Sequence, residues 1–318
     1  MTPTQLKAFA AIVRNGSAKA AAEELGISGA AISSHTAALR KELNDPLYHP
    51  SSSGLSFTPG GLRLAARAKE LLGLQEQTRQ EVLAASHGQR ILRLATTSLF
   101  AEYAAPGLLE LFKTRADDIE VEMSVHPGGR TDELLAAHQA DVIIAPFRRL
   151  PTESFRSSQF LRYELGLVTS VNHPLTLGRS DASTLRKQTW FLGPSAVEPH
   201  GATALLLKRF AVPEKNQRIF QSHAAAISEL QASKGIAILP DFRVASYVSN
   251  GSVERISAPG TTAPGIWSAT SLPGSRATAV AGELMRFITT PRAIRAMLSG
   301  SGANIRHFRP SVHITLWN

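Results

Sequence analysis

The chain's 318 residues, of which 43% are hydrophobic and 19% charged, can bury a sizeable core and favour two or more domains over one. Lysine and arginine outnumber aspartate and glutamate by 34 to 25, and this net charge of +9 favours anionic partners without indicating a fold. Because the sequence contains no cysteine, it excludes disulfide frameworks, thiolate nucleophiles and cysteine metal sites.

The sequence carries no pattern typical of export or membrane insertion. The apolar stretch Ala8–Val13 is shorter than a signal-peptide core and runs directly into Arg14. No window approaches the ~18 uncharged apolar residues that a membrane-spanning helix needs. We therefore expect a soluble protein of the cytoplasm that makes no membrane contact.

The first 58 residues have the pattern of three short helices. Ser17 is placed to cap a helix over residues 18–25, Gly26 ends it, and Ser28 is placed to cap a third helix that reaches about Leu43. Two helices joined so tightly around a glycine indicate a helix-turn-helix, whose second helix can enter a DNA major groove. An alanine-rich helical subdomain without a DNA role fits the same spacing, because basic and acidic residues nearly balance there.

A short hairpin is predicted after the third helix. Leu47-Tyr48 is followed by a run of small residues and then by Leu55-Ser56-Phe57, which alternates as a strand does. A hairpin at this place would form a wing, and wings usually contact the phosphate backbone. The fold class expected for residues 1–58 is therefore an all-α, winged helix-turn-helix DNA-binding domain.

Residues 1–88 resemble the N-terminal part of a LysR-type transcriptional regulator. Many small motifs in the same order carry this resemblance: Leu6-x-x-Phe9, Gly16-Ser17, Ala21-Ala22-x-x-Leu25-Gly26-Ile27-Ser28-x-x-Ala31-Ile32-Ser33, Leu39, Leu43, Leu47-Tyr48 and Phe57-Thr58-Pro59-Gly60-Gly61. The chain departs from the family where Gly29 replaces a glutamine, Ser34 a basic or amide residue, Arg40 a glutamate and Pro50 an arginine. The predicted DNA contacts are Ser17, Ser28, Gly29, Ala30, Ser33, Ser34, His35 and Arg40. Their short hydroxyls are expected to set register against phosphates, with DNA shape supplying more of the specificity.

Residues 59–88 are predicted to form a linker helix. Thr58-Pro59 is a strong helix start, and His87-Gly88 closes the helix. Seven positions repeat every 3.5 residues, as in the seam of a two-chain coiled coil: Leu64, Ala68, Leu71, Gln75, Thr78, Val82 and Ala85. An amphipathic helix packed on its own domain is the alternative. The resemblance implies that this helix dimerises the protein, and that dimers pair into a homotetramer.

From Arg90 onward, strand-like runs alternate with helices, which predicts parallel sheets in an α/β fold. Strands are expected over 91–95, 119–125, 141–145, 165–170, 235–240 and 267–272, with helices over 100–114, 131–138, 203–209 and 277–289. Motifs such as Asp141-Val142-Ile143-Ile144 and Asn172-His173-Pro174-Leu175 make this segment resemble the two-lobed effector-binding domain of the same family, which is similar to type 2 periplasmic binding proteins. The resemblance implies an effector domain over 89–298, with lobe I at 89–162 and 266–298 and lobe II at 163–265. Residues 299–318 are a C-terminal extension whose apolar end is expected to pair with a sheet edge or another subunit.

The predicted ligand site lies where strands lead into helices. Thr97, Ser98 and Thr131 occupy such turns, and Ser195 matches loosely a loop that the family uses for effector contact. Plain helix capping is the simpler explanation of each hydroxyl taken alone, and a ligand site is favoured because Thr97, Ser98 and Thr131 are expected to converge in one cleft. With the nearby Arg130, this set favours a small anionic effector such as a carboxylate.

The chain lacks the common catalytic motifs. Its ten histidines form no metal-binding pattern, and no G-x-S-x-G, phosphate loop or dinucleotide fingerprint is present. We therefore expect no cofactor, no metal and no enzymatic activity. The function predicted is that of a transcriptional regulator that binds double-stranded promoter DNA under the control of a small effector. The alternatives are a small α/β enzyme acting on an anionic metabolite, with a helical appendage, and a solute-binding protein.

Overall fold

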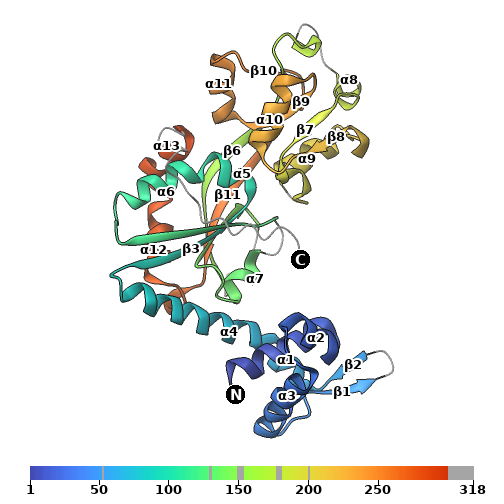
Figure 1. The fold of residues 1–318 in the computed structure, drawn as a ribbon. Helices are drawn as coiled ribbons and strands as arrows, with labels where there is room; N and C mark the ends of the chain where they lie inside the picture. The colour runs from blue at the N-terminus through green and yellow to red at the C-terminus, as the bar shows by residue number, and fades with distance from the viewer. Residues whose placement is uncertain (52–53, 129–130, 149–153, 177–180, 200, 300–318) are drawn as a thin grey trace. The chain divides into compact units, whose positions relative to one another are not determined.

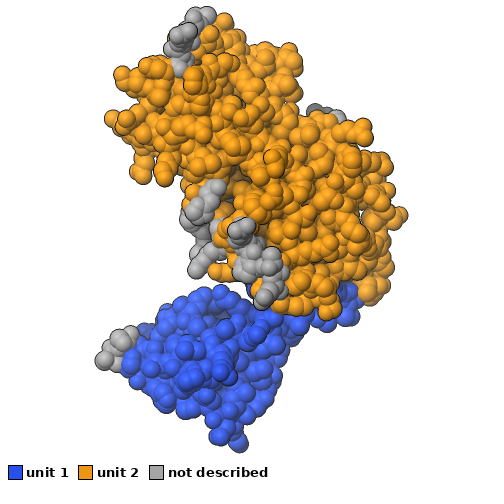
Figure 2. Space-filling model, turned by 180° about the vertical axis from the view of Figure 1, so that it is seen from behind, with its two compact units in different colours: residues 1–83, 136–139 blue, residues 84–135, 140–318 orange. Residues whose placement is uncertain are grey.

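The computed structural model describes residues 1–51, 54–128, 131–148, 154–176, 181–199 and 201–299. The chain divides into two compact units (Figure 2). Residues 1–83 with 136–139 form the first unit, and the rest of the described chain forms the second. No helix within the described ranges is long and apolar enough to cross a membrane.

The first unit begins with the three predicted helices, α1 (Pro3–Asn15), α2 (Ala18–Leu25) and α3 (Gly29–Leu43). The two predicted caps are confirmed. The hydroxyls of Ser17 and Ser28 each accept a 3.1 Å hydrogen bond from the backbone N–H of the residue three positions later. Gly26 ends α2 with φ at +63°, a conformation that favours glycine. The sharp turn between α2 and α3 therefore follows from local sequence.

A two-stranded wing follows α3. Strand β1 (Tyr48–Ser51) pairs antiparallel with β2 (Gly54–Phe57), as the sequence predicted. Beneath the wing, Phe9, Leu39 and Leu47 are almost completely buried and form one apolar cluster. The wing, α1 and α3 thus share a core, which fixes the wing against the helices.

Helix α4 (Pro59–Ala85) starts at the predicted Thr58, whose hydroxyl accepts a 2.9 Å hydrogen bond from the Gly61 backbone. Gly61 lies so close to the preceding segment that a Cβ atom there would come within 1.9 Å of the Leu47 carbonyl oxygen. The predicted seam is uneven in a single chain, since Ala68 is buried whereas Val82 is 65% exposed. The C-terminal half of the seam therefore presents apolar side chains to solvent.

The second unit contains a nine-stranded sheet in the order β4-β3-β5-β11-β6-β9-β7-β8, with β10 paired to β6. The sequence predicted parallel strands, and this prediction is wrong for the centre of the nine-stranded sheet. Strands β3 (Arg90–Thr96), β4 (Ile119–Val125) and β5 (Val142–Pro146) are parallel, but β11 (Thr262–Ser271) runs antiparallel to both β5 and β6 (Arg156–Thr169). The physical reason is that the chain leaves one lobe on β6 and returns on β11, so the two strands must run in opposite directions (Figure 1).

The crossing strands divide the second unit into two lobes. Lobe I holds β3, β4 and β5, and lobe II holds β7 (Trp190–Leu192), β8 (Gln217–Ile219), β9 (Ile236–Pro240) and β10 (Glu254–Arg255). The helices of lobe I are α5 (Ser98–Tyr103), α6 (Ala105–Lys113), α7 (Thr131–Ala136), α12 (Ala279–Phe287) and α13 (Pro291–Ser299), and those of lobe II are α8 (Ala182–Arg186), α9 (Ala202–Arg209), α10 (His223–Ala232) and α11 (Asp241–Ser249).

Two further expectations differ from the structure. One helix was expected over 100–114, but α5 and α6 are separate because the chain breaks at Ala104, just before Pro106 in the first turn of α6. Helix α13 was not expected at all. The C-terminal extension predicted over 299–318 lies outside the described residues beyond Ser299.

An aromatic cluster holds the crossing strands together. Trp267 on β11 is fully buried and stacks on Tyr163 of β6, with ring centroids 4.1 Å apart. Phe100 of α5 meets the same indole edge-on at 5.1 Å. Such pairs add specific geometry to the burial of large apolar surfaces. The strands between the lobes and the first helix of lobe I therefore pack as one core.

Candidate nucleic-acid interface and ligand cavity

Helix α3 separates a buried face from an exposed face. Ile32, Thr36 and Leu39 are buried, and the Thr36 hydroxyl donates to the Ile32 carbonyl at 2.8 Å. Ile32 packs against α1 and α2, and Leu39 clusters with residues of α1 and the segment before the wing. The opposite face is exposed and carries three of the predicted DNA contacts, Ala30, Ser33 and Ser34. Two more, Ser28 and Gly29, are exposed at the N-terminal end of the helix.

The other predicted contacts have different surroundings. Ser17 is half-buried as the cap of α2, and His35 is half-buried on α3. The Arg40 guanidinium lies 4.3 Å from the centre of the Tyr48 ring and donates to the Tyr48 carbonyl oxygen at 3.1 Å. Arg40 therefore connects α3 to the wing. Ala37 and Lys41, which the sequence prediction did not include, are also exposed and continue the outer face of α3 by helical spacing.

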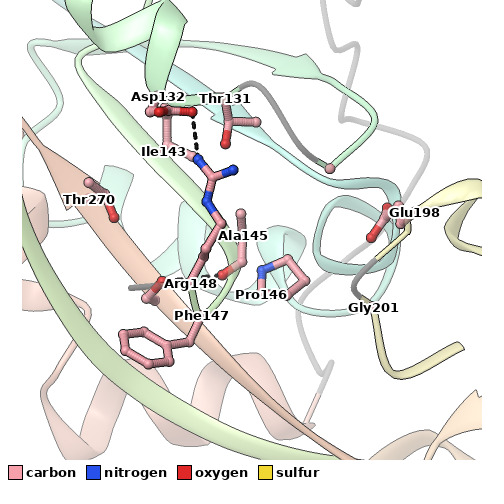
Figure 3. Close-up of a pocket in the computed structure, with 12 residues that line it drawn as sticks. Thr131, Asp132, Ile143, Ala145, Pro146, Phe147, Arg148, Glu198, Gly201 and Thr270 are labelled. Atoms are coloured by element: carbon pink, nitrogen blue, oxygen red, sulfur yellow. Dashed lines mark hydrogen bonds and ion pairs between the residues drawn. The ribbon is translucent and has the colours of Figure 1, made fainter. Parts of the chain in front are cut away.

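A cavity of about 320 Å³ lies in the second unit, between segments of both lobes (Figure 3). That volume is at the lower end of the range for small-molecule sites, about 300–1,000 Å³. Lobe I and the crossing strands supply most of the wall, and residues that follow η2 (Pro194–Val197) supply the rest from lobe II. The lining residues are Gly128, Thr131, Asp132, Ile143, Ala145, Pro146, Phe147, Arg148, Glu198, Gly201, Ser268 and Thr270.

One charged pair lies on the lobe I side of the cavity. Arg148 Nη2 and Asp132 Oδ1 are 2.6 Å apart, and both side chains are partly exposed. Thr131, a predicted ligand residue, is the neighbour of Asp132 at the start of α7 and is almost fully buried. Figure 3 shows the Asp132–Arg148 pair set apart from Glu198.

Glu198 supplies a buried carboxyl from lobe II. Glu198 is only 4% exposed, and its Oε1 accepts a long, 3.4 Å hydrogen bond from the hydroxyl of Ser98. Burial raises the pKa of Glu198 to about 7, and the Ser98 hydrogen bond offsets this only in part. Ser98, a predicted ligand residue, thus reaches the cavity wall through Glu198. The sequence signal for Glu198 was weak, since it lies three residues after the predicted Ser195.

Thr97 and Ser195, like Ser98, are not among the residues that line the cavity. Thr97 is fully buried, and its hydroxyl oxygen has no hydrogen-bond partner within the described part of the chain. Ser195 is also buried, and its hydroxyl lies 2.8 Å from His223 Nε2 and 2.9 Å from the Thr203 hydroxyl. The structure therefore places Thr131 on the cavity wall, Ser98 behind the lining residue Glu198, and Thr97 and Ser195 inside the lobes.

A hydrogen-bond cluster that the sequence did not reveal connects the lobes. The carboxylate of Glu102 in α5 accepts bonds from His223 Nδ1 at 2.8 Å and from the backbone nitrogens of His223 and Ala224 at 3.0 and 3.1 Å. Burial alone would raise the pKa of Glu102, but the hydrogen bonds from His223 outweigh it and the pKa is lowered. Glu102 thus caps α10 of the opposite lobe. Among the described residues, no group of three or more histidine or acidic side chains could hold a metal ion.

Comparisons with known proteins agree with this architecture. Residues 3–62 match the bacterial regulatory helix-turn-helix model of the lysR family, and residues 85–291 match the LysR substrate binding domain. An uncharacterized HTH-type transcriptional regulator of Mycobacterium tuberculosis is 49% identical over 322 residues, covering 100% of both chains.

Solved structures give the same fold at low sequence identity. ArgP from Mycobacterium tuberculosis is similar with a TM-score of 0.59 and 17% identity, over 93% of this chain and 97% of that one. Full-length CbnR in complex with its target DNA is similar with a TM-score of 0.56 and 21% identity, over 93% of this chain and 100% of that one. The two family models together span most of the sequence, so the chain belongs to the LysR family of helix-turn-helix transcriptional regulators.

Proposed function

We propose that this LysR-type regulator binds promoter DNA through the outer face of α3, and that a small effector in the cavity of the second unit modulates this binding. The observation that carries the DNA proposal is the exposed, small-residue face of a capped and tightly packed helix-turn-helix. The contacts proposed are Ser17, Ser28, Gly29, Ala30, Ser33, Ser34, His35 and Arg40, with Arg40 acting through the wing. Because LysR-type regulators are not enzymes, family membership decides against the enzyme alternative.

Dimerisation supplies the affinity that one module lacks. Basic and acidic residues nearly balance in the helix-turn-helix, so a single copy gains little from phosphate neutralisation. Two copies joined along α4 would bind two half-sites at once. Leu71 and Val82, 40% and 65% exposed in one chain, are the apolar seam positions available for this contact. We propose a homodimer built on α4, and pairing of dimers into a tetramer, acting in the cytoplasm on promoter DNA.

The proposed effector is small and carries an anionic group. Arg148 lies on the cavity wall on the lobe I side and is paired with Asp132, and an anionic group of the effector would share its guanidinium. Arg130, part of the sequence argument for an anion, lies outside the described residues. Thr131 and Ser98 are proposed as effector residues of the cavity, and Thr97 and Ser195 as residues that support it from within the lobes. The effector would act by binding one arrangement of the lobes and subunits more tightly than another.

The test begins with genomic footprinting of the purified full chain, followed by anisotropy titration of the fragments found. We expect affinity that exceeds that for bulk competitor DNA and falls steeply with salt. Ala30→Glu places a carboxylate on the outer face of α3 and should weaken binding. The matched control Ala66→Glu makes the same change at an exposed position of α4 and should not. Equal affinity for promoter and competitor fragments would refute the proposal.

A further inference from the structure

Glu198 is a buried acid on the wall of an otherwise mostly apolar and neutral cavity. It is 4% exposed, and it reaches the cavity from the segment that follows η2 in lobe II. Figure 3 shows its carboxylate apart from the Asp132–Arg148 pair. A carboxylate removed from water in this way is normally matched by a cation or by several hydrogen bonds.

The described residues do not supply that match. Ser98 is the side-chain partner of Glu198 in this part of the chain, and its hydroxyl is 3.4 Å away, near the limit for a hydrogen bond. Arg148, the basic residue on the lining, pairs with Asp132 at 2.6 Å. Because Arg148 is paired with Asp132, an ionised Glu198 has no cationic partner among the described residues of the lining.

The chemistry of an occupant follows from this missing partner. A second anionic group beside Glu198 would add like-charge repulsion at a site that water hardly reaches. A protonated amine would instead neutralise the carboxylate and donate up to three hydrogen bonds to it and to neighbouring oxygens. Since burial raises the pKa of Glu198 to about 7, a substantial fraction is already ionised near neutral pH, and a bound cation would complete the ionisation.

We propose that the effector is an amino-acid-like zwitterion whose protonated amine binds the carboxylate of Glu198. This inference rests on the proposed function, which assigns the anionic group of the effector to the Thr131–Arg148 side of the same cavity. A small zwitterion places its two charged groups within one compact molecule, in keeping with a cavity of about 320 Å³. Glu198 would then select the amine, and the effector carboxylate would share the Arg148 guanidinium with Asp132.

The experiment compares matched ligands on the full chain. The probes are the common L-amino acids, the 2-hydroxy acids in which a hydroxyl replaces each amine, and the primary amines in which the carboxylate is removed. Thermal-shift screening finds the binders, and isothermal titration calorimetry measures their dissociation constants. The variants are Glu198→Gln, which removes the charge and keeps the shape, and the control Glu164→Gln, which changes an exposed acid on β6.

We expect at least one amino acid to bind about tenfold or more tightly than its hydroxy acid and its decarboxylated amine, an approximate threshold for one charged contact. In Glu198→Gln, the ratio of the dissociation constants of the hydroxy acid and the amino acid should fall to near one. In Glu164→Gln, this ratio should stay as in the wild type. A hydroxy acid or a simple amine that binds as tightly as the amino acid, an amine preference that survives in Glu198→Gln, or no binding by any probe would each overturn the inference. Promoter titration without ligand tests the proposed function separately, since DNA binding can succeed when the zwitterion fails.

Discussion

The wild-type protein should lose free energy of unfolding as pH rises because Glu198 ionises, and Glu198→Gln should not show this loss. Burial raises the pKa of this carboxyl from 4.5 to about 7 in the folded state. The folded protein therefore binds this proton more tightly than the unfolded chain does. The resulting stabilisation is fully present below pH 4.5 and is lost as pH rises through about 7.

The magnitude follows from the two pKa values. Each pH unit between them changes the free energy of unfolding by about 1.4 kcal/mol. From about pH 5.5 to 8.5 the wild-type protein should thus lose roughly 2 kcal/mol through Glu198. For a unit of this size, that corresponds to a decrease in Tm of about 4–8 °C. Glutamine cannot ionise, so the free energy of unfolding of Glu198→Gln should rise relative to that of the wild type by this amount as pH increases.

The assay is differential scanning calorimetry of the second unit's transition across that pH range. The lowered pKa values of His126, which is half-buried, and His173, which is buried, act in the opposite direction, so the wild-type curve alone is a mixture of effects. The difference between wild type and Glu198→Gln isolates one carboxyl, and Glu164→Gln controls for the loss of an acid. Parallel curves for wild type and Glu198→Gln would refute the reasoning.

Three further predictions concern other parts of the chain. Glu102→Ala removes three hydrogen bonds from the start of α10 and leaves the buried His223 without its carboxylate, so urea titration should show a loss of about 3 kcal/mol. Gly61→Ala drives a Cβ atom to within 1.9 Å of a backbone oxygen and should destabilise the first unit by about 2 kcal/mol, measured by its unfolding transition. Combined Ser33→Ala and His35→Ala substitutions should weaken promoter binding about tenfold, and unchanged gel-shift affinity would remove both from the interface.

Local features were predictable because their causes lie within a few residues. Ser17 and Ser28 cap the helices that immediately follow them, and each cap bond joins residues three apart. The wing was predictable for the same reason, since β1 and β2 are consecutive. The exposed face of α3 then follows from helical geometry alone.

The cavity depended on contacts that local pattern does not encode. Ser98 and Glu198 are separated by 100 positions, and Glu102 and His223 by 121. Nothing near either acid in the sequence indicates its partner. Thr97 was chosen from a strand-to-helix turn and Ser195 from its resemblance to a family loop, but the packing of distant strands decides which way each segment faces. The direction of β11 was missed for the same reason, because it depends on a crossing made about a hundred residues earlier.

The route of β11 also has a consequence for biosynthesis. Strand β5 pairs with β11 through residues such as Ile144 and Ala269, so one edge of the first lobe stays open until about 120 further residues have been made. At about 5–20 residues per second, the ribosome takes roughly 6–25 seconds to supply them. The second lobe leaves the ribosome complete within that interval. The nascent chain should therefore carry one finished lobe beside one unfinished lobe, and its exposed strand edge is where chaperone protection matters most.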